Sequence, residues 1–259
     1  MRYALGIEYR GTSYCGWQRQ PHCDSVQQNV ESALGYVADH PIELVCAGRT
    51  DSGVHAVEQV AHFDSSSARS TRAWILGANC RLPRDIRIKW VVPVAEDFHA
   101  RFKATARSYR YIVLNDAVPS ALFHDLAAWE LRSLDQEAMN ACAQLLLGEH
   151  DFSSFRAVGC QSKTAFRNVL QISVTRRDNM IYLDIMANAF LYHMVRNIAG
   201  SLLVVGKGEQ DSNWFRTVFA ARDRKLAAPT APAAGLYFVR ASYDDKYMLP
   251  IAGKKTVLF

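Results

Sequence analysis

The chain has 259 residues, 49% of them hydrophobic, and a formal net charge of +5 at pH 7. This length allows a large core, in one long domain or two of ordinary size, and the mild positive charge permits a polyanionic partner without requiring one. No apolar run reaches the ~18 residues that a membrane-spanning helix needs, and no secretory leader pattern opens the chain, so we expect a cytoplasmic protein with no membrane partner.

The first part of the chain alternates strand and helix patterns. Strands are predicted at 3–9, 42–47, 57–63 and 86–92, and helices at 26–38 and 71–80. Ser25 and Gln28 form a capping-box pattern at the start of the first helix. The order β-α-β-β-α-β is that of a ferredoxin-like arrangement, an antiparallel sheet with helices on one face.

Residues 98–105 carry no strong periodicity, and we expect them to link two halves, 1–105 and 106–259. Further strands are predicted at 108–114, 169–176, 180–187 and 236–241, and further helices at 134–147, 190–205 and 212–221. The second half therefore repeats the strand-and-helix order of the first, with insertions. An α+β fold is the prediction.

A polar loop at 47–56 holds the candidate reactive group. Gly48 and Gly53 close its two ends, which suits a tight, exposed loop. Asp51 is its only carboxylate, and the nearby Arg49 favours the ionised form of that carboxylate. An ionised aspartate can act as a nucleophile, a general base or a metal ligand, whereas many turn aspartates only bond the local backbone.

The predicted helix at 190–205 is apolar around most of its circumference. Its polar stripe contains His193, Arg196, Asn197 and Gly200. A buried arginine would need an anionic partner, while an exposed stripe would only face water, and the sequence leaves both possibilities open.

Tyr109 and Tyr111 share one face of a predicted strand, where they either line a cleft or fill the core. Tyrosine next to basic residues also suits base stacking with phosphate contacts. The basic clusters are Arg81, Arg84, Arg87 and Lys89; Arg101, Lys103, Arg107 and Arg110; and Arg222, Arg224 and Lys225. Each is either a solvated face or part of a nucleic-acid surface.

The six cysteines, at 15, 23, 46, 80, 142 and 160, show neither a Cys-x-x-Cys pair nor the spacing of a zinc site. We expect reduced thiols that pack as small hydrophobic side chains. A metal hydrolase built on Asp51, His55 and His62 would lack further ligands. A two-carboxylate hydrolase is the other enzyme class to weigh. Its possible second acids near the loop are Glu8, Glu58 and Asp64.

Six segments together resemble the motifs of the tRNA pseudouridine synthase A family. The segment 48–56 is similar to the catalytic motif of that family, 11–20 to its N-terminal motif and 98–111 to its mid-chain motif. The segments 151–155, 194–198 and 231–236 fit in the expected order. The departures are Ser52 in place of the usual Ala, Arg10 where Asp is common, and Ala233 where Pro is frequent.

The resemblance implies a role for each matching residue. Asp51 is similar to the catalytic aspartate, and Arg196 to the basic partner that keeps it ionised. Tyr109 is similar to the tyrosine against the target base, and Leu236 to the apolar floor under the uracil. Arg49 resembles the arginine that fills the space left by a flipped nucleotide.

The resemblance also implies the rest of the biochemistry. The expected fold has two ferredoxin-like halves in one extended antiparallel sheet, with the active-site cleft between them. The expected enzyme is an isomerase that turns uridine into pseudouridine at positions 38, 39 and 40 of the anticodon stem-loop in several tRNAs. It is expected to work as a homodimer without a metal or an organic cofactor.

Overall fold

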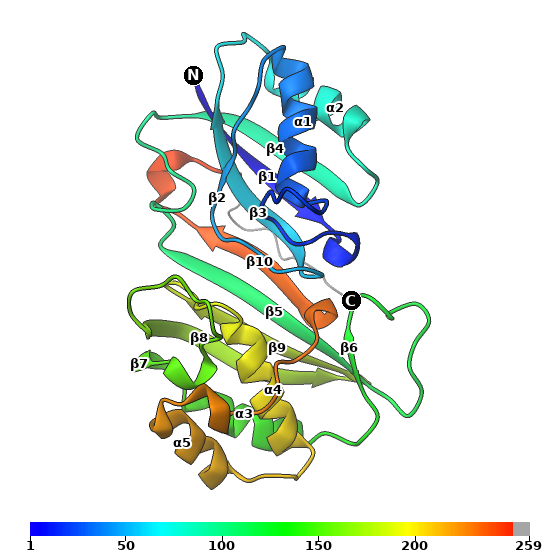
Figure 1. The fold of residues 1–259 in the computed structure, drawn as a ribbon, viewed down its shortest axis with the longest axis vertical. Coiled ribbons are helices and arrows are strands. Elements are labelled where there is room, and N and C mark those ends of the chain that lie inside the picture. The colour runs from blue at the N-terminus through cyan, green and yellow to red at the C-terminus, as the bar shows by residue number, and fades with distance from the viewer. Residues whose placement is uncertain (251–259) are drawn as a thin grey trace. The chain divides into compact units, whose positions relative to one another are not determined.

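A computed structural model describes residues 1–250 of the chain (Figure 1). The chain forms two compact units: Met1–Arg107 with the chain from Tyr237 onward is unit 1, and Ser108–Leu236 is unit 2. Each unit combines mostly antiparallel strands with helices, which confirms the predicted α+β class. The predicted halves, 1–105 and 106–259, stay a prediction, and residues 251–259 lie outside the described part.

Unit 1 is built around four neighbouring strands in the order β4-β1-β3-β10, with β2 paired to β3. The strands are β1 (Arg2–Tyr9), β2 (Val45–Cys46), β3 (His55–Asp64), β4 (Ile86–Val94) and β10 (Leu236–Ser242), and the helices are α1 (Val26–Ala38) and α2 (Thr71–Arg81). β1 runs antiparallel to both neighbours, while β10 pairs in parallel with β3 through Tyr237 and His55. This pairing returns the C-terminal part of the chain to unit 1.

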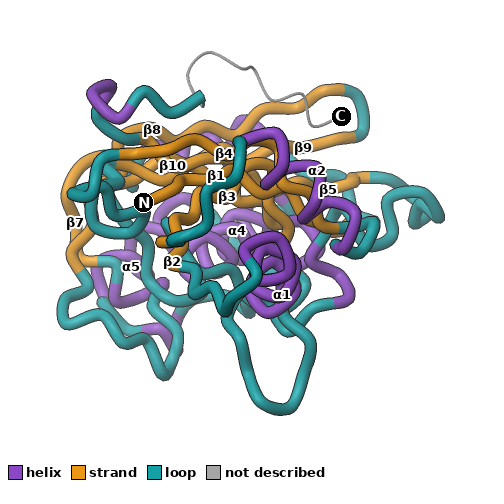
Figure 2. The backbone as a smooth tube through the Cα atoms, turned by 90° about the horizontal axis from the view of Figure 1, so that it is seen from above, coloured by secondary structure: helices purple, strands orange, loops and turns teal. Residues whose placement is uncertain are grey.

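The helices of unit 1 bury their apolar stripes. α1 and α2 pack on each other, and α1 lies on one side of strands β1 and β3 (Figure 2). Val30 and Leu34 of α1 are fully buried, as is Trp74 of α2, whose ring contacts Tyr3 and Phe63. Apolar burial of this kind is the main stabilising contribution to such a layer.

The predicted cap of α1 forms only in part. The Ser25 side chain accepts the Gln28 N–H at 3.3 Å, as an N-cap residue should. The Ser25 N–H, however, donates to Asp24 Oδ1 at 2.9 Å, so this donor is satisfied by Asp24. The predicted helix start is confirmed by the cap.

Unit 2 has the strand order β5-β9-β8-β7, with β6 paired in parallel to β5. The strands are β5 (Ala106–Asn115), β6 (Ala128–Glu130), β7 (Gly148–Asp151), β8 (Phe166–Arg177) and β9 (Met180–Ala187). The helices are α3 (Gln136–Gln144), α4 (Met194–Gly206) and α5 (Ser212–Ala221). The three helices pack together, with α3 against β8, around buried Phe152, Phe155 and Phe215.

Short 3₁₀ helices complete the described elements at Gly11–Ser13, Ser153–Phe155, Arg224–Leu226, Ala233–Gly235 and Asp245–Tyr247. Several predicted elements have different bounds; the helix predicted at 134–147, for example, spans Gln136–Gln144. α4 begins at Met194 because His193 has a left-handed backbone, with φ of 58°. The predicted strand at 42–47 pairs only at Val45 and Cys46, since the Leu44 N–H donates to Glu31 Oε1 at 2.9 Å. Within residues 1–250, no helix is long and apolar enough to cross a membrane.

Candidate active site

The Asp51 loop connects β2 to β3 and ends in a tight turn. The Val54 N–H donates to the Asp51 carbonyl at 3.1 Å, and Gly53 has a φ of 76°, in the left-handed region that glycine enters readily. At the start of the loop, Gln59 Nε2 donates to the Gly48 carbonyl at 2.6 Å. Asp51 itself is partly exposed, in a loop whose backbone is held.

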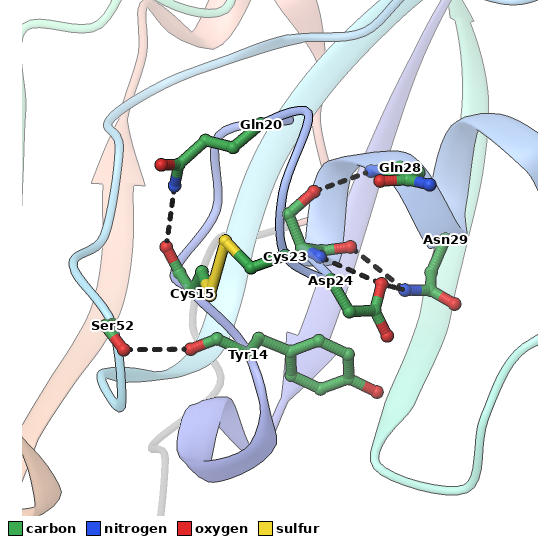
Figure 3. The surroundings of a disulfide bond; sticks show 9 residues. Tyr14, Cys15, Gln20, Cys23, Asp24, Gln28, Asn29 and Ser52 are labelled. Atoms are coloured by element: carbon green, nitrogen blue, oxygen red, sulfur yellow. Dashed lines mark hydrogen bonds between the residues drawn. A yellow bond between two sulfur atoms is a disulfide. The ribbon is translucent and has the colours of Figure 1, made fainter.

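The N-terminal motif backs this loop directly. The Trp17 N–H donates to the Thr50 carbonyl at 3.0 Å, and the Gly53 N–H donates to the Tyr14 carbonyl at 3.4 Å. The Ser52 hydroxyl donates to the same Tyr14 carbonyl at 3.2 Å (Figure 3). The N-terminal motif, about 35 residues earlier in the sequence, therefore holds the residues on both sides of Asp51.

Two glycines make this close approach possible. A Cβ on Gly16, whose φ is +91°, would lie 2.5 Å from the Thr50 carbonyl oxygen. A Cβ on Gly11 would overlap the Val54 carbonyl oxygen. The glycines of the N-terminal motif are therefore required by the contact between two backbones.

Buried polar groups fix both ends of the reactive segment. The Tyr9 hydroxyl shares a hydrogen bond of 2.7 Å with Thr50 Oγ1, and burial raises the pKa of that tyrosine well above its ordinary value. After the loop, His55 Nδ1 accepts the Gly11 N–H at 3.0 Å. The His55 ring also stacks on Tyr237 at a centroid distance of 4.7 Å. His55 is thus fully buried and structural.

Arg107, from the mid-chain motif, supports the loop from another direction. Its guanidinium donates to the carbonyls of Ala47 at 3.2 Å, Ala104 at 2.9 Å and Arg101 at 2.5 Å. The sequence placed Arg107 in a basic cluster suited to phosphate, but in the structure it joins backbone carbonyls. Three motifs therefore meet at the Asp51 loop within unit 1.

The expectation that all six cysteines are reduced thiols is corrected by the structure. Cys15 and Cys23 form a disulfide, with their Cα atoms 6.1 Å apart (Figure 3). The chain folds back between them, as the Cys15 N–H donates to the Asp24 carbonyl at 2.9 Å and Gln20 Nε2 donates to the Cys15 carbonyl at 3.2 Å. The other four cysteines are free. A spacing of eight residues carries no sequence signature, so only the fold reveals this pair.

In unit 2, the two tyrosines of β5 have different surroundings. The Tyr111 hydroxyl donates to the Pro232 carbonyl at 2.8 Å, and burial raises its pKa far above the ordinary value. Tyr111 therefore fills the core. Tyr109 meets Phe190 edge to face at 4.9 Å, which sets the orientation of its ring.

Three residues of the predicted polar stripe, Arg196, Asn197 and Gly200, lie in α4 and contact protein, whereas His193 precedes the helix. Arg196 Nε donates to the Ala231 carbonyl at 2.8 Å, and the Ala231 N–H donates to the Arg196 carbonyl at 3.1 Å. Asn197 is fully buried and donates to the Phe155 carbonyl at 2.8 Å. A Cβ on Gly200 would overlap the Pro229 carbonyl oxygen. The stripe therefore holds the segment at 229–231 against the helix.

The same segment leads to Leu236, which is buried. Just before it, a Cβ on Gly235 would lie 2.6 Å from the Ile112 carbonyl oxygen, so this segment also lies close on β5. Tyr109, Arg196 and Leu236 thus come from three elements packed together in unit 2. Asp51 and Arg49 belong to unit 1. The roles assigned to these five residues stay predictions.

The residues of the rival hydrolase mechanisms have other partners. Lys89 Nζ lies 3.0 Å from Glu8, Trp90 Nε1 donates to Glu58 at 2.7 Å, and Arg2 lies 2.8 Å from Asp64. The Ala100 N–H donates to His62 Nδ1 at 3.1 Å, and burial lowers the pKa of His62 to about 4. In the described part of the chain, no three His, Cys, Asp or Glu side chains lie where they could jointly hold a metal ion.

The family model and the curated relatives of this chain agree with each other. The family model of tRNA pseudouridine synthase matches residues 6–103 and 142–244. The tRNA pseudouridine synthase A of Hydrogenovibrio crunogenus is 57% identical over 247 residues, covering 95% of this chain and 94% of that protein. The enzyme of the same name from Vibrio vulnificus is 52% identical over 250 residues, covering 96% and 95%. A chain in a solved Cbf5-Nop10-Gar1 complex is a weak match, with a TM-score of 0.36 and 12% identity over 91% of this chain and 48% of that one.

Proposed function

The chain belongs to the tRNA pseudouridine synthase family, and from that premise we propose that it isomerises uridine to pseudouridine at positions 38, 39 and 40 of the anticodon stem-loop in several tRNAs. One observation supports the proposal most strongly. A single carboxylate, Asp51, stands at the tip of a loop whose backbone is held on both sides by hydrogen bonds from the N-terminal motif.

The reaction needs few groups. The uracil leaves C1′ of the ribose, turns and rejoins it through C5; C5 then loses its proton, and N1, now free of the ribose, takes up a proton. Substrate and product are isomers, so atoms and electrons balance without a redox partner. Asp51 assists cleavage of the glycosidic bond, either by attack on the sugar or by removal of its 2′ proton.

The remaining residues bind and orient the base. The target uridine must leave its stack, at a cost of a few kcal/mol. Arg49 fills the space that the extruded uridine leaves in the stack. Tyr109 and Leu236 enclose the base so that the free uracil is retained. Tyr109 also accepts the C5 proton. Its edge-to-face contact with Phe190 supports this role, because a ring with a fixed orientation can position a base.

Arg196 is the residue that keeps Asp51 ionised in this mechanism. An opposite charge beside a carboxylate lowers its pKa. The hydrogen bond from Arg196 Nε to the Ala231 carbonyl supports the assignment, because it holds the guanidinium group at its Nε atom. The two residues belong to different units, so this pairing is tested most directly in solution.

The partners follow from the same premise. We propose that a homodimer in the cytoplasm binds tRNA and needs neither a metal nor an organic cofactor. RNA binding of this kind uses phosphate contacts, and it should weaken steeply as salt concentration rises, because each neutralised phosphate releases a counterion.

The test is to map pseudouridines in tRNA from cells with and without this protein. Loss of sites confined to positions 38, 39 and 40 supports the proposal. Loss confined to the T-arm, the D-arm or ribosomal RNA contradicts it. The same map made from cells that carry Asp51→Asn should match the map of cells that lack the protein.

A further inference from the structure

Phe102 is an exposed aromatic ring that the protein holds in one orientation. Its side chain is 74% exposed, although single exposed apolar residues are common on protein surfaces. The ring lies on a turn closed by the Lys103 N–H, which donates to the His99 carbonyl at 2.9 Å. It stacks on the His99 ring at a centroid distance of 4.3 Å and an interplanar angle of 29°. One face of Phe102 is thus covered by His99, while the residue as a whole stays largely exposed to a partner.

The ring beneath Phe102 is itself fixed. His99 Nδ1 accepts the backbone N–H groups of Arg101 and Phe102, each at 3.2 Å. The other side of His99 lies against the His62 ring, 4.8 Å away. Burial and the charge of Arg2 lower the pKa of His99, which favours the neutral imidazole. Phe102 therefore stacks on a neutral imidazole that is itself held in place by the tilted ring of His62.

A cation lies over this ring. The Arg101 guanidinium carbon is 5.5 Å from the centroid of Phe102, and the Arg101 side chain is exposed. The nearby carboxylate of Asp97 pairs with Lys103 at 3.9 Å and Lys246 at 3.5 Å. Two lysines therefore compensate Asp97, which leaves the charge of Arg101 next to Phe102.

This surface is tied to the Asp51 loop. Arg107 donates to the carbonyls of both Arg101 and Ala47, and so connects the Phe102 turn to the start of the loop. Arg49 and Arg101 both act on the buried Cys46 thiol, where they oppose the effect of burial, which raises its pKa to about 12. Charges from the loop and from the turn therefore lie near the same point.

We propose that Phe102 stacks on an unpaired RNA base next to the target uridine, and that Arg101 contacts the adjoining phosphate. The inference rests on the proposed function and extends it. Extrusion of the target uridine disturbs the stacking of the nucleotides around it, and a fixed aromatic ring can stack on one of them while Arg49 fills the vacated space. Aromatic rings with neighbouring cations are the usual platform for unpaired nucleotides.

The experiment measures affinity and turnover in the full-length protein. Unmodified, fluorescently labelled tRNA is titrated into Asp51→Asn protein that carries Phe102→Ala, Phe102→Trp or no further change. Phe166→Ala is the matched control, since Phe166 is also an exposed phenylalanine (52%) and lies at the start of β8 in unit 2. Release of tritium from C5-labelled uridine is measured for the same variants with Asp51 present.

We expect Phe102→Ala to weaken tRNA affinity about tenfold, within the roughly 5- to 150-fold range for loss of one base–aromatic stack. The tRNA affinity of Phe102→Trp should stay within about twofold of the parent, because indole stacks as well. For both Phe102 variants, the rate of tritium release at saturating tRNA should change little. The inference is overturned if Phe102→Ala binds tRNA as Phe166→Ala does. It is also overturned if Phe102→Ala changes only the oligomeric state. Failure of the wild-type protein to release tritium would instead contradict the proposed function.

Discussion

Gly16→Ala tests whether the N-terminal motif sets the position of the Asp51 loop. The new Cβ would lie 2.5 Å from the Thr50 carbonyl oxygen, whereas ordinary van der Waals contact begins at 3.4 Å. One backbone must therefore move away from the other by about 0.9 Å. Trp17 and Thr50 share the hydrogen bond next to this contact, so the movement is expected to break it.

Two terms contribute to the cost of this substitution. A left-handed backbone at a residue with a Cβ costs about 1–2 kcal/mol, and Gly16 has a φ of +91°. Loss of the neighbouring hydrogen bond costs about 1 kcal/mol more. We expect the free energy of unfolding to fall by about 2–3 kcal/mol. A displacement of about 1 Å near reacting atoms typically costs about 100-fold in rate.

Gly159→Ala is the matched control, because Gly159 also has a positive φ, +83°, but a Cβ there meets no atom within 4 Å. Urea unfolding and tritium release at saturating tRNA are measured for both variants. Gly159→Ala should lose only the backbone term and keep its turnover rate. If Gly16→Ala matches the control in both measurements, the N-terminal motif does not position Asp51.

Two further predictions concern pH. Arg196→Met should move the acid limb of the pH–rate profile to higher pH, because Asp51 would lose the cation that lowers its pKa. The control is Arg110→Met, which breaks an ion pair with Asp184 and should leave that limb in place. His62 has a pKa of about 4 in the folded protein, against about 6.5 in the unfolded chain. As pH falls below about 6.5, the unfolded chain therefore binds the proton first, and up to about 3 kcal/mol of stability is lost by pH 4. Urea unfolding at pH 7 and pH 4.5 should show a smaller difference for His62→Gln than for the wild type, and an equal difference would exclude His62 as the titrating group.

Strong periodicity predicted most of the fold. The last helix occupies Ser212–Ala221, as expected, because its apolar stripe and the N-cap residue Asp211 lie in one continuous segment. The hairpin around 178–179 is likewise formed by β8 and β9. The sequence missed β6 and β7, which have three and four residues and too little pattern to be distinguished from loops.

Periodicity reports burial more directly than hydrogen bonding. Ile42 and Leu44 are buried, as the strand pattern implied, yet neither lies in a strand. At Leu44 a glutamate side chain takes up the backbone N–H. For the helix predicted at 190–205, the apolar run begins four residues before the helix itself, which starts at Met194. A left-handed residue, His193, ends that continuity, and no sequence rule requires one there.

The candidate site could be found from motifs, but its supports could not. Asp51 was identified from its position between glycines. Arg107 and Phe102 were not, since an arginine that joins three carbonyls and a phenylalanine stacked on a histidine look like any other cation and apolar residue in the sequence. The signal that would have found them is their location in the mid-chain motif, next to segments that carry no periodicity of their own.

The most direct test of the central claim is tritium release from C5-labelled uridine in unmodified tRNA, without added metal, by the wild type and by Asp51→Asn. The substitution is nearly isosteric and Asp51 is partly exposed, so the free energy of unfolding should change little and tRNA affinity should stay within a few-fold of the wild type. We predict that the wild type releases tritium and that Asp51→Asn releases none above background. Appreciable release by Asp51→Asn would contradict the mechanism, and no release by the wild type would contradict the function.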